Sequence, residues 1–131
     1  MANVLLDTTV AIDLLRAAPD AVAWLRRIQA TGDIPFVCAV TAEEVSVGLR
    51  PRERERAAAL FEGLAPAPLT IAEGRLAGWW RRSFRSRGRT LSQGDCLIAA
   101  SAVSIGARLA TGNSKDFPMK DLEVELVHSG R

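Results

Sequence analysis

Four acidic residues stand where an apolar segment ends or begins, and their carboxylates are the side chains best suited to chemistry in this chain. Asp7 follows the apolar run VLL directly, and Asp95 heads the almost wholly apolar stretch CLIAASAV. Glu44 lies in the sequence TAEEV after another apolar run, and Asp116 follows LATGNSK. An acid at the end of a buried strand must be desolvated or paired, which makes Asp7 the hardest of the four to explain as an ordinary surface charge.

Taken singly, three of these acids also have an ordinary structural explanation. Acidic residues in the first turn of a helix are stabilised by the helix dipole, and capping alone would explain Glu44 and Asp95. Asp116 alone would be a loop residue in a turn with Asn113. The conjunction favours a site, because four carboxylates at one place repel one another and raise their pKa values unless a cation neutralises them. Oxygen ligands of this kind favour Mg²⁺ or Mn²⁺.

The elements that must position these acids are short strands alternating with helices. This alternation predicts an α/β fold with a central, mostly parallel sheet of about four or five strands flanked by helices. In such a sheet the carboxyl ends of the strands and the starts of the following helices share one edge, where ligands bind. All four acids are expected at that edge. Expected strands cover residues 4–6, 34–40, 69–71, 108–110 and 124–127, and expected helices cover 10–15, 20–31, 41–49, 51–64, 72–87 and 93–105.

Several helix starts are predicted from capping residues. Asp20 is expected to cap the second helix, which stops at Gly32. Thr41 and Glu44 have the spacing of a capping box, and Ser92 is expected to cap the helix over residues 93–105.

The segment from residue 65 to 87 is expected to hold a loop and then an amphipathic helix. APAP at 65–68 is the clearest loop in the chain. In the helix, Ala72, Leu76, Trp79 and Trp80 are expected to form an apolar stripe. Stacking of the two tryptophans on bases is the alternative, but their spacing favours core or dimer packing.

Composition limits the class of protein. The chain has 131 residues, 48% hydrophobic and 24% charged, which predicts one folded domain over residues 1–131 and excludes a disordered or fibrous class. No leader and no apolar run of the ~20 residues that a membrane helix needs are found, so cytoplasmic residence without a membrane is expected. Cys38 and Cys96 are expected to be free buried thiols. The single histidine, His128, argues against zinc sites built from paired histidines, and motifs for nucleotide loops and serine hydrolases are absent.

Arginines are concentrated in RRSFRSRGR, residues 81–89. Their guanidinium groups match phosphate geometry, so Arg82, Arg85 and Arg87 are candidate contacts to an RNA backbone. The alternative is a solvated helix end, where arginines complement the negative end of the helix dipole. The general preference for arginine over lysine is equally explained by a GC-rich genome.

Four blocks of the sequence together resemble the PIN-domain ribonucleases, specifically the VapC-type toxins of VapBC toxin–antitoxin pairs. The blocks are LLDTTV at 5–10, TAEEVSVGL at 41–49, DCLIAASA at 95–102 and LATGNSKDF at 109–117, in the order of the family. The resemblance implies a PIN fold, dependence on Mg²⁺ or Mn²⁺ and cleavage of RNA. It also implies a homodimer and neutralisation by a cognate VapB-type antitoxin.

The resemblance also assigns roles by position. Asp7, Glu44, Asp95 and Asp116 match the catalytic, metal-binding acids of the family. Glu44 is preferred to Glu43 because the family acid stands four residues before a glycine, here Gly48. Gly112 is a departure, because many relatives carry a basic residue there, and this puts an RNA or partner contact in doubt. Thr9 and Asn113 match positions that support the acids, with Thr8 and Thr111 as weaker candidates.

These assignments lead to a hypothesis of RNA phosphodiester hydrolysis by a metal-activated water. Asp7, Asp95 and Asp116 would hold one or two metal ions, and Glu44 would be a further ligand or orient the water. A catalytically silent PIN-like module that binds RNA or protein is the alternative. A phosphotransfer enzyme of the haloacid dehalogenase type fits poorly, because Thr9 stands where its second aspartate is needed, and a receiver domain fits less well still.

Overall fold

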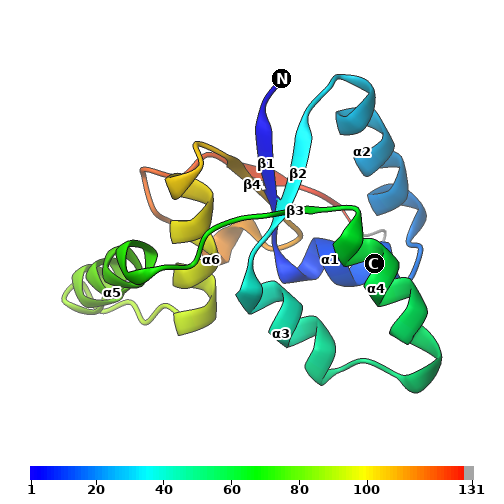
Figure 1. The fold of residues 1–131 in the computed structure, drawn as a ribbon. Coiled ribbons are helices and arrows are strands. Elements are labelled where there is room, and N and C mark those ends of the chain that lie inside the picture. Colours follow the sequence, from blue (N-terminus) through cyan, green and yellow to red (C-terminus); the bar gives the residue numbers. More distant parts are fainter. Residues whose placement is uncertain (129–131) are drawn as a thin grey trace.

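The structure is a computed structural model that describes residues 1–128. These residues form a five-stranded parallel sheet with helices around it (Figure 1). Every pair of neighbouring strands is parallel, so the mostly parallel sheet predicted from the sequence is confirmed. The spatial order is β3-β2-β1-β4-β5. The strands are β1 (Asn3–Leu6), β2 (Ile34–Val37), β3 (Ala65–Pro66), β4 (Arg108–Thr111) and β5 (Val124–Leu126).

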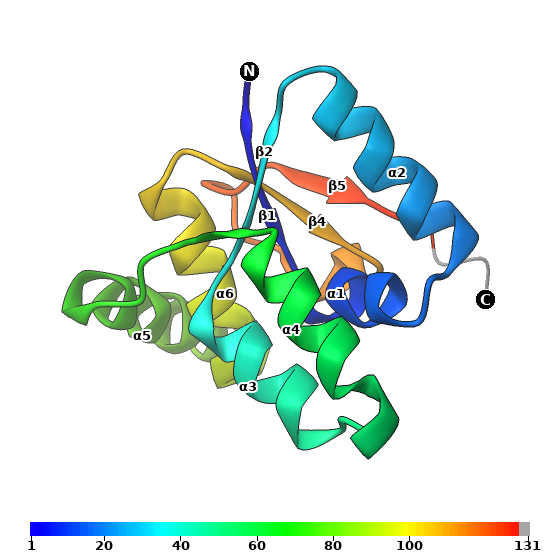
Figure 2. The same ribbon diagram turned by 45° about the vertical axis from the view of Figure 1, so that its right-hand side comes forward.

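Helices cover both faces of the sheet, as Figures 1 and 2 show. Helices α5 and α6 lie on one face, and α2 and α4 lie on the other. Helices α1 and α3 stand near the carboxyl ends of the strands, where α1 contacts both α3 and α4. The α-helices are α1 (Thr8–Leu15), α2 (Pro19–Ala30), α3 (Ala39–Val47), α4 (Arg54–Glu62), α5 (Ile71–Arg85) and α6 (Gln93–Ser104), and the short 3₁₀ turns are η1 (Pro51–Glu53) and η2 (Ser114–Asp116).

The core is divided by the sheet because successive strand side chains point to opposite faces. In β1, Leu5 packs with residues of α5 and α6, whereas Val4 and Leu6 pack with residues of α1 and α2. All three side chains are 0% exposed. A continuous apolar run is what a central strand covered on both faces requires, and this explains the sequence VLL.

The topology creates a switch point at the carboxyl ends of β1 and β4. The chain leaves β1 toward β2 on one side, while β4 is added on the other side. Leu6 pairs with Ala110, so the next residues, Asp7 and Thr111, follow at the same edge. Such a switch point is where open parallel sheets bind ligands.

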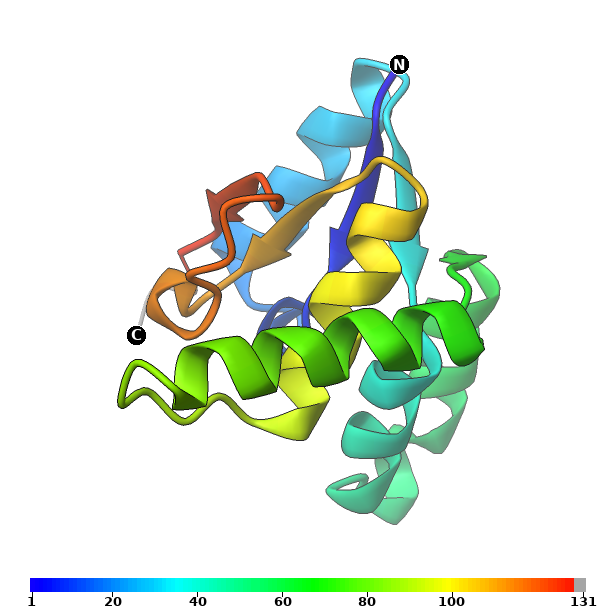
Figure 3. The same ribbon diagram turned by 90° about the vertical axis from the view of Figure 1, so that its left-hand side faces the viewer.

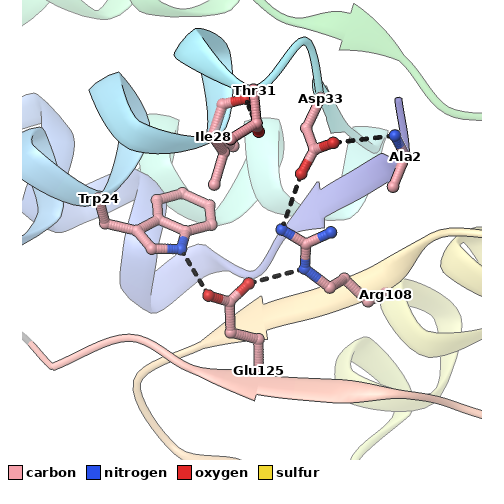
Figure 4. Close-up of polar contacts among 7 residues, drawn as sticks. All are labelled: Ala2, Trp24, Ile28, Thr31, Asp33, Arg108 and Glu125. Carbon is pink, nitrogen blue, oxygen red and sulfur yellow. Dashed lines mark hydrogen bonds and ion pairs between the residues drawn. The ribbon is translucent and has the colours of Figure 1, made fainter.

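The opposite edge of the sheet is held by a polar network (Figure 4). Arg108, at the start of β4, forms ion pairs with Asp33 at 3.1 Å and Glu125 at 2.7 Å. The indole of Trp24 on α2 donates to Glu125 at 2.9 Å, and the backbone of Ala2 donates to Asp33 at 2.9 Å. Hydrogen bonds from Ala2 and Arg108 hold the pKa of Asp33 below its usual value. These contacts fasten the amino ends of the strands, away from the four acids.

The predicted start of the third helix is wrong. Strand β2 ends at Val37, and α3 begins at Ala39 with Cys38 as its N-cap. Thr41 is therefore inside the helix and fully buried, so it cannot form the predicted capping box with Glu44. The apolar residues at 38–40 fit a strand and a buried helix turn equally well, and periodicity cannot separate the two.

Two further boundaries also differ from the prediction. Helix α2 begins at Pro19, which is pre-organised for the first helical position, so Asp20 lies in the first turn rather than at the cap. The third strand lies at Ala65–Pro66, inside the predicted loop, and not at 69–71. It is an edge strand, where proline is tolerated. Residue 70 instead opens α5 through a capping box with Glu73.

The apolar stripe predicted on α5 is only partly correct. Trp80 is 5% exposed and packs in the core, whereas Trp79 is 63% exposed. Consecutive helical residues point about 100° apart, so the two tryptophans cannot both face the core. Ala72 is exposed, and the buried face runs instead through Ala77 and Trp80.

The predictions of a cap at Ser92, a helix end at Gly32 and two free thiols are confirmed. Ser92 caps α6, accepting a hydrogen bond from the Asp95 backbone at 3.1 Å. Gly32 follows the end of α2 with a φ of 84°, a conformation that favours glycine. Cys38 and Cys96 are free and buried. No helix within residues 1–128 is long and apolar enough to cross a membrane.

Candidate active site

Asp7 is a buried carboxylate held by two threonine hydroxyls. It stands between β1 and α1, is 4% exposed, and its side chain forms no capping bond to the helix. Its Oδ2 instead accepts hydrogen bonds from Thr111 Oγ1 at 2.7 Å and Thr9 Oγ1 at 3.1 Å. Burial raises the pKa of Asp7, and the hydrogen bond from Thr111 is the largest effect that opposes this rise. Burial therefore makes ionisation of Asp7 less favourable than in water, and the threonine hydroxyls offset part of this effect.

Both hydroxyls are themselves fixed by the loop after β4. Thr111 Oγ1 accepts from the backbone of Asn113 at 3.0 Å, and Thr9 Oγ1 accepts from the backbone of Gly112 at 2.8 Å. A Cβ atom on Gly112 would stand 3.3 Å from Thr9 Oγ1, which is tighter than most such contacts. The glycine that departs from the family pattern thus allows the loop to approach Thr9 closely.

Glu44 lies on α3 and its carboxylate is directed toward the start of α1. Its Oε1 accepts a hydrogen bond from Thr8 Oγ1 at 2.5 Å. The same hydroxyl lies 3.1 Å from Thr41 Oγ1. The neighbouring Glu43 is also exposed, but the bond to Thr8, the residue after Asp7, distinguishes Glu44.

The negative charges of the other three acids act on Asp95. It lies half-buried in the first turn of α6. Burial raises the pKa of Asp95, and the negative charges of Asp7, Asp116 and Glu44 raise it further. Like charges act this way only at short range, so the four acids lie near enough to influence one another.

Asp116, like Glu44, is exposed to solvent. It closes η2 after β4, and its Oδ2 accepts from Asn113 Nδ2 at 2.8 Å. The preceding residue, Lys115, accepts a hydrogen bond at its carbonyl from the Arg89 guanidinium. Arg89 thereby joins the loop before α6 to the segment that carries Asp116.

The donor chemistry of this region fits a hard divalent cation. Four carboxylates supply oxygen ligands and negative charge, which suit Mg²⁺ or Mn²⁺. Within residues 1–128, however, no three acidic, histidine or cysteine side chains are arranged so that they could hold a metal ion as they stand. The acids share one region of the sheet edge without forming a closed cluster.

The predicted RNA-contacting arginines fall into two groups. Arg82 and Arg85 are exposed on α5, which runs beside α6 (Figure 3). The Arg87 guanidinium instead lies 4.2 Å from the ring centre of Phe84 and donates to the carbonyl of Ser83 at 3.4 Å. This bond to a carbonyl in the last turn of α5 fits the alternative explanation, a solvated helix end where arginines complement the helix dipole.

The sequence did not predict the positions of three further residues near the site. Thr41 was interpreted as a cap, although its spacing of three from Glu44 puts both on one helix face. Gly94 lies against Glu44, and only its position beside Asp95 could have pointed to it. The charge of Arg81 on α5 reaches α6, where it opposes the burial that raises the pKa of Cys96 to about 11.

Comparisons with known proteins agree on one family. A profile of the PIN domain matches residues 4–121. Ribonuclease VapC19 of Mycobacterium tuberculosis is 33% identical over 115 residues, covering 88% of this chain and 92% of the relative. Ribonuclease VapC10 of the same species is 34% identical over 116 residues, covering 88% of this chain and 86% of the relative.

Solved structures share the fold. A chain of VapBC2 from Rickettsia felis, bound to a promoter DNA fragment, superposes with a TM-score of 0.83 at 18% identity, covering 95% of this chain and 98% of the other. A chain of VapBC-1 from nontypeable Haemophilus influenzae gives a TM-score of 0.79 at 23% identity, covering 95% and 97%. At these identities the likeness concerns the fold.

Proposed function

Because the chain belongs to the PIN-domain family and is homologous to VapC ribonuclease toxins, we propose that it is a metal-dependent endoribonuclease that hydrolyses RNA phosphodiester bonds. The observation that carries the proposal is the placement of the acids at the switch point of the sheet, where Asp7 follows β1, Glu44 accepts a hydrogen bond from Thr8, and Glu44 Oε2 lies beside Gly94, the residue before Asp95. Structural charges are normally paired with opposite charges, whereas this group concentrates like charges. A divalent cation and a phosphate backbone would explain such an arrangement.

In this proposal Asp7, Asp95 and Asp116 hold Mg²⁺ or Mn²⁺, with Glu44 as a further ligand or as the group that orients the attacking water. When bound, the ion would supply activation of water and stabilisation of charge on phosphate oxygens. Thr9 keeps Asp7 in one orientation, together with the hydroxyl of residue 111. Asn113 restrains Asp116 through its side-chain amide.

The test compares cleavage of a panel of structured RNAs by the wild type and Asp95→Asn, with Mn²⁺ and then with a chelator. We expect the variant and the chelated wild type each to lose roughly 10²-fold or more in rate. Asp7→Asn should lose activity equally. Undiminished cleavage by Asp7→Asn in metal-free buffer would refute the proposal.

The choice of the second acid is tested by a matched pair of neighbours. Glu44→Gln should lose activity on the same scale as Asp95→Asn. Glu43→Gln removes the same charge one position earlier and should remain active. The reverse result would move the assignment to Glu43.

We place the RNA backbone along the arginines of residues 81–89. Arg82 and Arg85 support this because they are exposed beside the helix that carries Asp95. Arg85→Glu combined with Arg87→Glu should weaken RNA binding and flatten its dependence on salt, since fewer counterions are released. Unchanged binding at low salt would contradict this placement.

The proposed partners are a VapB-type antitoxin, which would neutralise the activity, and a second copy of the chain. A chain of a toxin–antitoxin complex from Klebsiella pneumoniae has the same fold, which supports the first partner. Large apolar side chains exposed on α3 and α5 support the second: Val47 is 78% exposed, Ile71 80% and Trp79 63%. That residues 1–131 form a single PIN domain remains a prediction. A monomeric mass in light scattering would contradict the homodimer.

A catalytically silent PIN-like binding module is the second candidate. The absence of a closed metal-binding cluster within the described residues favours it. Calorimetric titration with Mn²⁺ separates the two functions. Binding that is lost in Asp95→Asn would support the nuclease, and failure of the folded wild type to bind would support the silent module.

A further inference from the structure

The Glu44 carboxylate is exposed to solvent, yet it is restrained from two sides. A glutamate has three rotatable side-chain bonds and loses considerable freedom when it is held in one place. Here Oε1 accepts the hydrogen bond of Thr8 at 2.5 Å, and Oε2 lies beside Gly94. Restraint of an exposed carboxylate indicates that its position matters.

The first restraint is a pair of threonine hydroxyls joining α1 to α3. Thr8 Oγ1 lies 3.1 Å from Thr41 Oγ1, and Thr41 is 0% exposed. A buried hydroxyl needs a partner, and β-branched side chains have few rotamers, so the pair fixes where the Thr8 hydroxyl points. Thr41 lies one turn before Glu44 on α3, so both contacts use the same helix face.

The second restraint is the first turn of α6. A Cβ atom added to Gly94 would lie 3.2 Å from Glu44 Oε2 and 3.6 Å from Val40 Cγ1. Glycine, whose side chain is a single hydrogen atom, is therefore the residue that leaves Glu44 Oε2 undisturbed. The amino end of α6 carries partial positive charge, which favours a carboxylate there.

We propose that Thr8, Thr41 and Gly94 are positioning residues that fix the Glu44 carboxylate relative to Asp7 and Asp95. Thr8 follows Asp7 in the chain, and Gly94 precedes Asp95. Residues adjacent to Asp7 and Asp95 thus hold the carboxylate of Glu44. The inference rests on the proposed metal-dependent function, because it concerns the placement of one of its acids.

The main test is Thr8→Val, which keeps the shape of the side chain and removes the hydroxyl. Mn²⁺ affinity by calorimetry is measured beside kcat and KM for RNA cleavage. We expect Mn²⁺ affinity and kcat each to fall about 10-fold with little change in KM, because groups that orient metal ligands typically contribute 10–100-fold. Thr8→Ser restores the hydroxyl and should return both values close to the wild type.

Thr31→Val is the matched control. It removes a threonine hydroxyl that donates to the carbonyl of Ile28 at 2.8 Å, at the end of α2 away from the acids. Mn²⁺ affinity and kcat should not change. A comparable loss in Thr31→Val would show a general structural effect and overturn the inference.

Gly94→Ala tests the second restraint independently of the hydroxyl pair. Alanine is the better helix former, so the unfolding temperature should stay level or rise. Mn²⁺ affinity and kcat should nevertheless fall several-fold, because the added methyl group displaces the Glu44 carboxylate. This opposition between stability and metal binding is not expected of a residue that only supports the fold.

The outcomes separate this inference from the function on which it rests. A wild type that binds Mn²⁺ and cleaves RNA, with Thr8→Val and Gly94→Ala equal to it, overturns the positioning role and leaves the proposed function intact. A folded wild type that neither binds Mn²⁺ nor cleaves RNA overturns the proposed function and the inference with it. If Thr8→Val does not fold, Gly94→Ala decides the result.

Discussion

Replacing Thr111 with valine should lower stability in a way that depends on pH. The change keeps the shape of a side chain that is 0% exposed but removes the hydroxyl bonded to Asp7 at 2.7 Å. A hydrogen bond to a charged group contributes about 1.5–3 kcal/mol, and the backbone N–H of Asn113 also loses its acceptor. We expect a loss of about 2–4 kcal/mol at neutral pH, equivalent to a fall of roughly 10 °C in unfolding temperature.

The pH dependence follows from the direction of the Asp7 shift. Burial already raises the pKa of Asp7 above 3.8, and removing the Thr111 bond raises it further. An acid whose pKa is raised by folding destabilises the folded state once pH exceeds its ordinary pKa, and the full penalty is present above the folded pKa. The loss in Thr111→Val should therefore be smallest where Asp7 is protonated, where the unpaired Asn113 amide still contributes, and it should grow as pH rises.

Urea unfolding of the metal-free protein at about pH 4.5 and pH 8 measures this difference. Ser101→Ala is the control, because its buried hydroxyl donates to a neutral acceptor, the carbonyl of Pro68, at 2.7 Å. It should cost about 1 kcal/mol at both pH values. A loss in Thr111→Val that is the same at both pH values would refute the reasoning.

Three further measurements address other parts of the fold. Trp80→Ala should lower the free energy of unfolding by about 3–5 kcal/mol because the indole is buried. Trp79 is exposed, so Trp79→Ala should have only a small effect. Equal losses in urea unfolding would contradict the packing of α5. Cys38 and Cys96 should not react with a thiol reagent at neutral pH until urea is added. Both side chains are buried, and burial raises the pKa of Cys96 to about 11. Rapid labelling of the native protein would contradict this. Arg108→Met should lower the unfolding temperature by roughly 2–5 °C without changing Mn²⁺ affinity, and a change in affinity would show that the two sheet edges are coupled.

The parts of the fold that could be predicted are those where one physical requirement dominates. The run VLL before Asp7 predicts a strand covered on both faces, and it forms β1. Ser92 before an apolar segment marks the start of α6, because an N-cap satisfies free backbone amides. These two elements carry two of the acids, which is why the edge of the site could be expected from the sequence.

Where two local requirements competed, the sequence did not decide between them. Thr41 and Glu44 fit a capping box, but the buried surface shared with α1 draws the helix start back to Ala39. Pro66 reads as a loop residue, yet pairing with β2 makes a two-residue edge strand. Contacts between distant segments, such as Thr8 with Glu44, are invisible in local patterns because only the tertiary fold brings the two helices together.

The hydrogen bond between Thr111 and Asp7 joins positions 104 residues apart in a chain of 131. A ribosome synthesises β1 before its neighbour β4, so Asp7 has no hydroxyl partner until the residues between the two strands have been made. A product that terminates before β4 carries Asp7 without the strand that orients it. Long-range pairing of this kind also forms slowly, because loop closure precedes the contact. The acidic edge therefore assembles only after β4 has been made, and chains that lack β4 do not possess it.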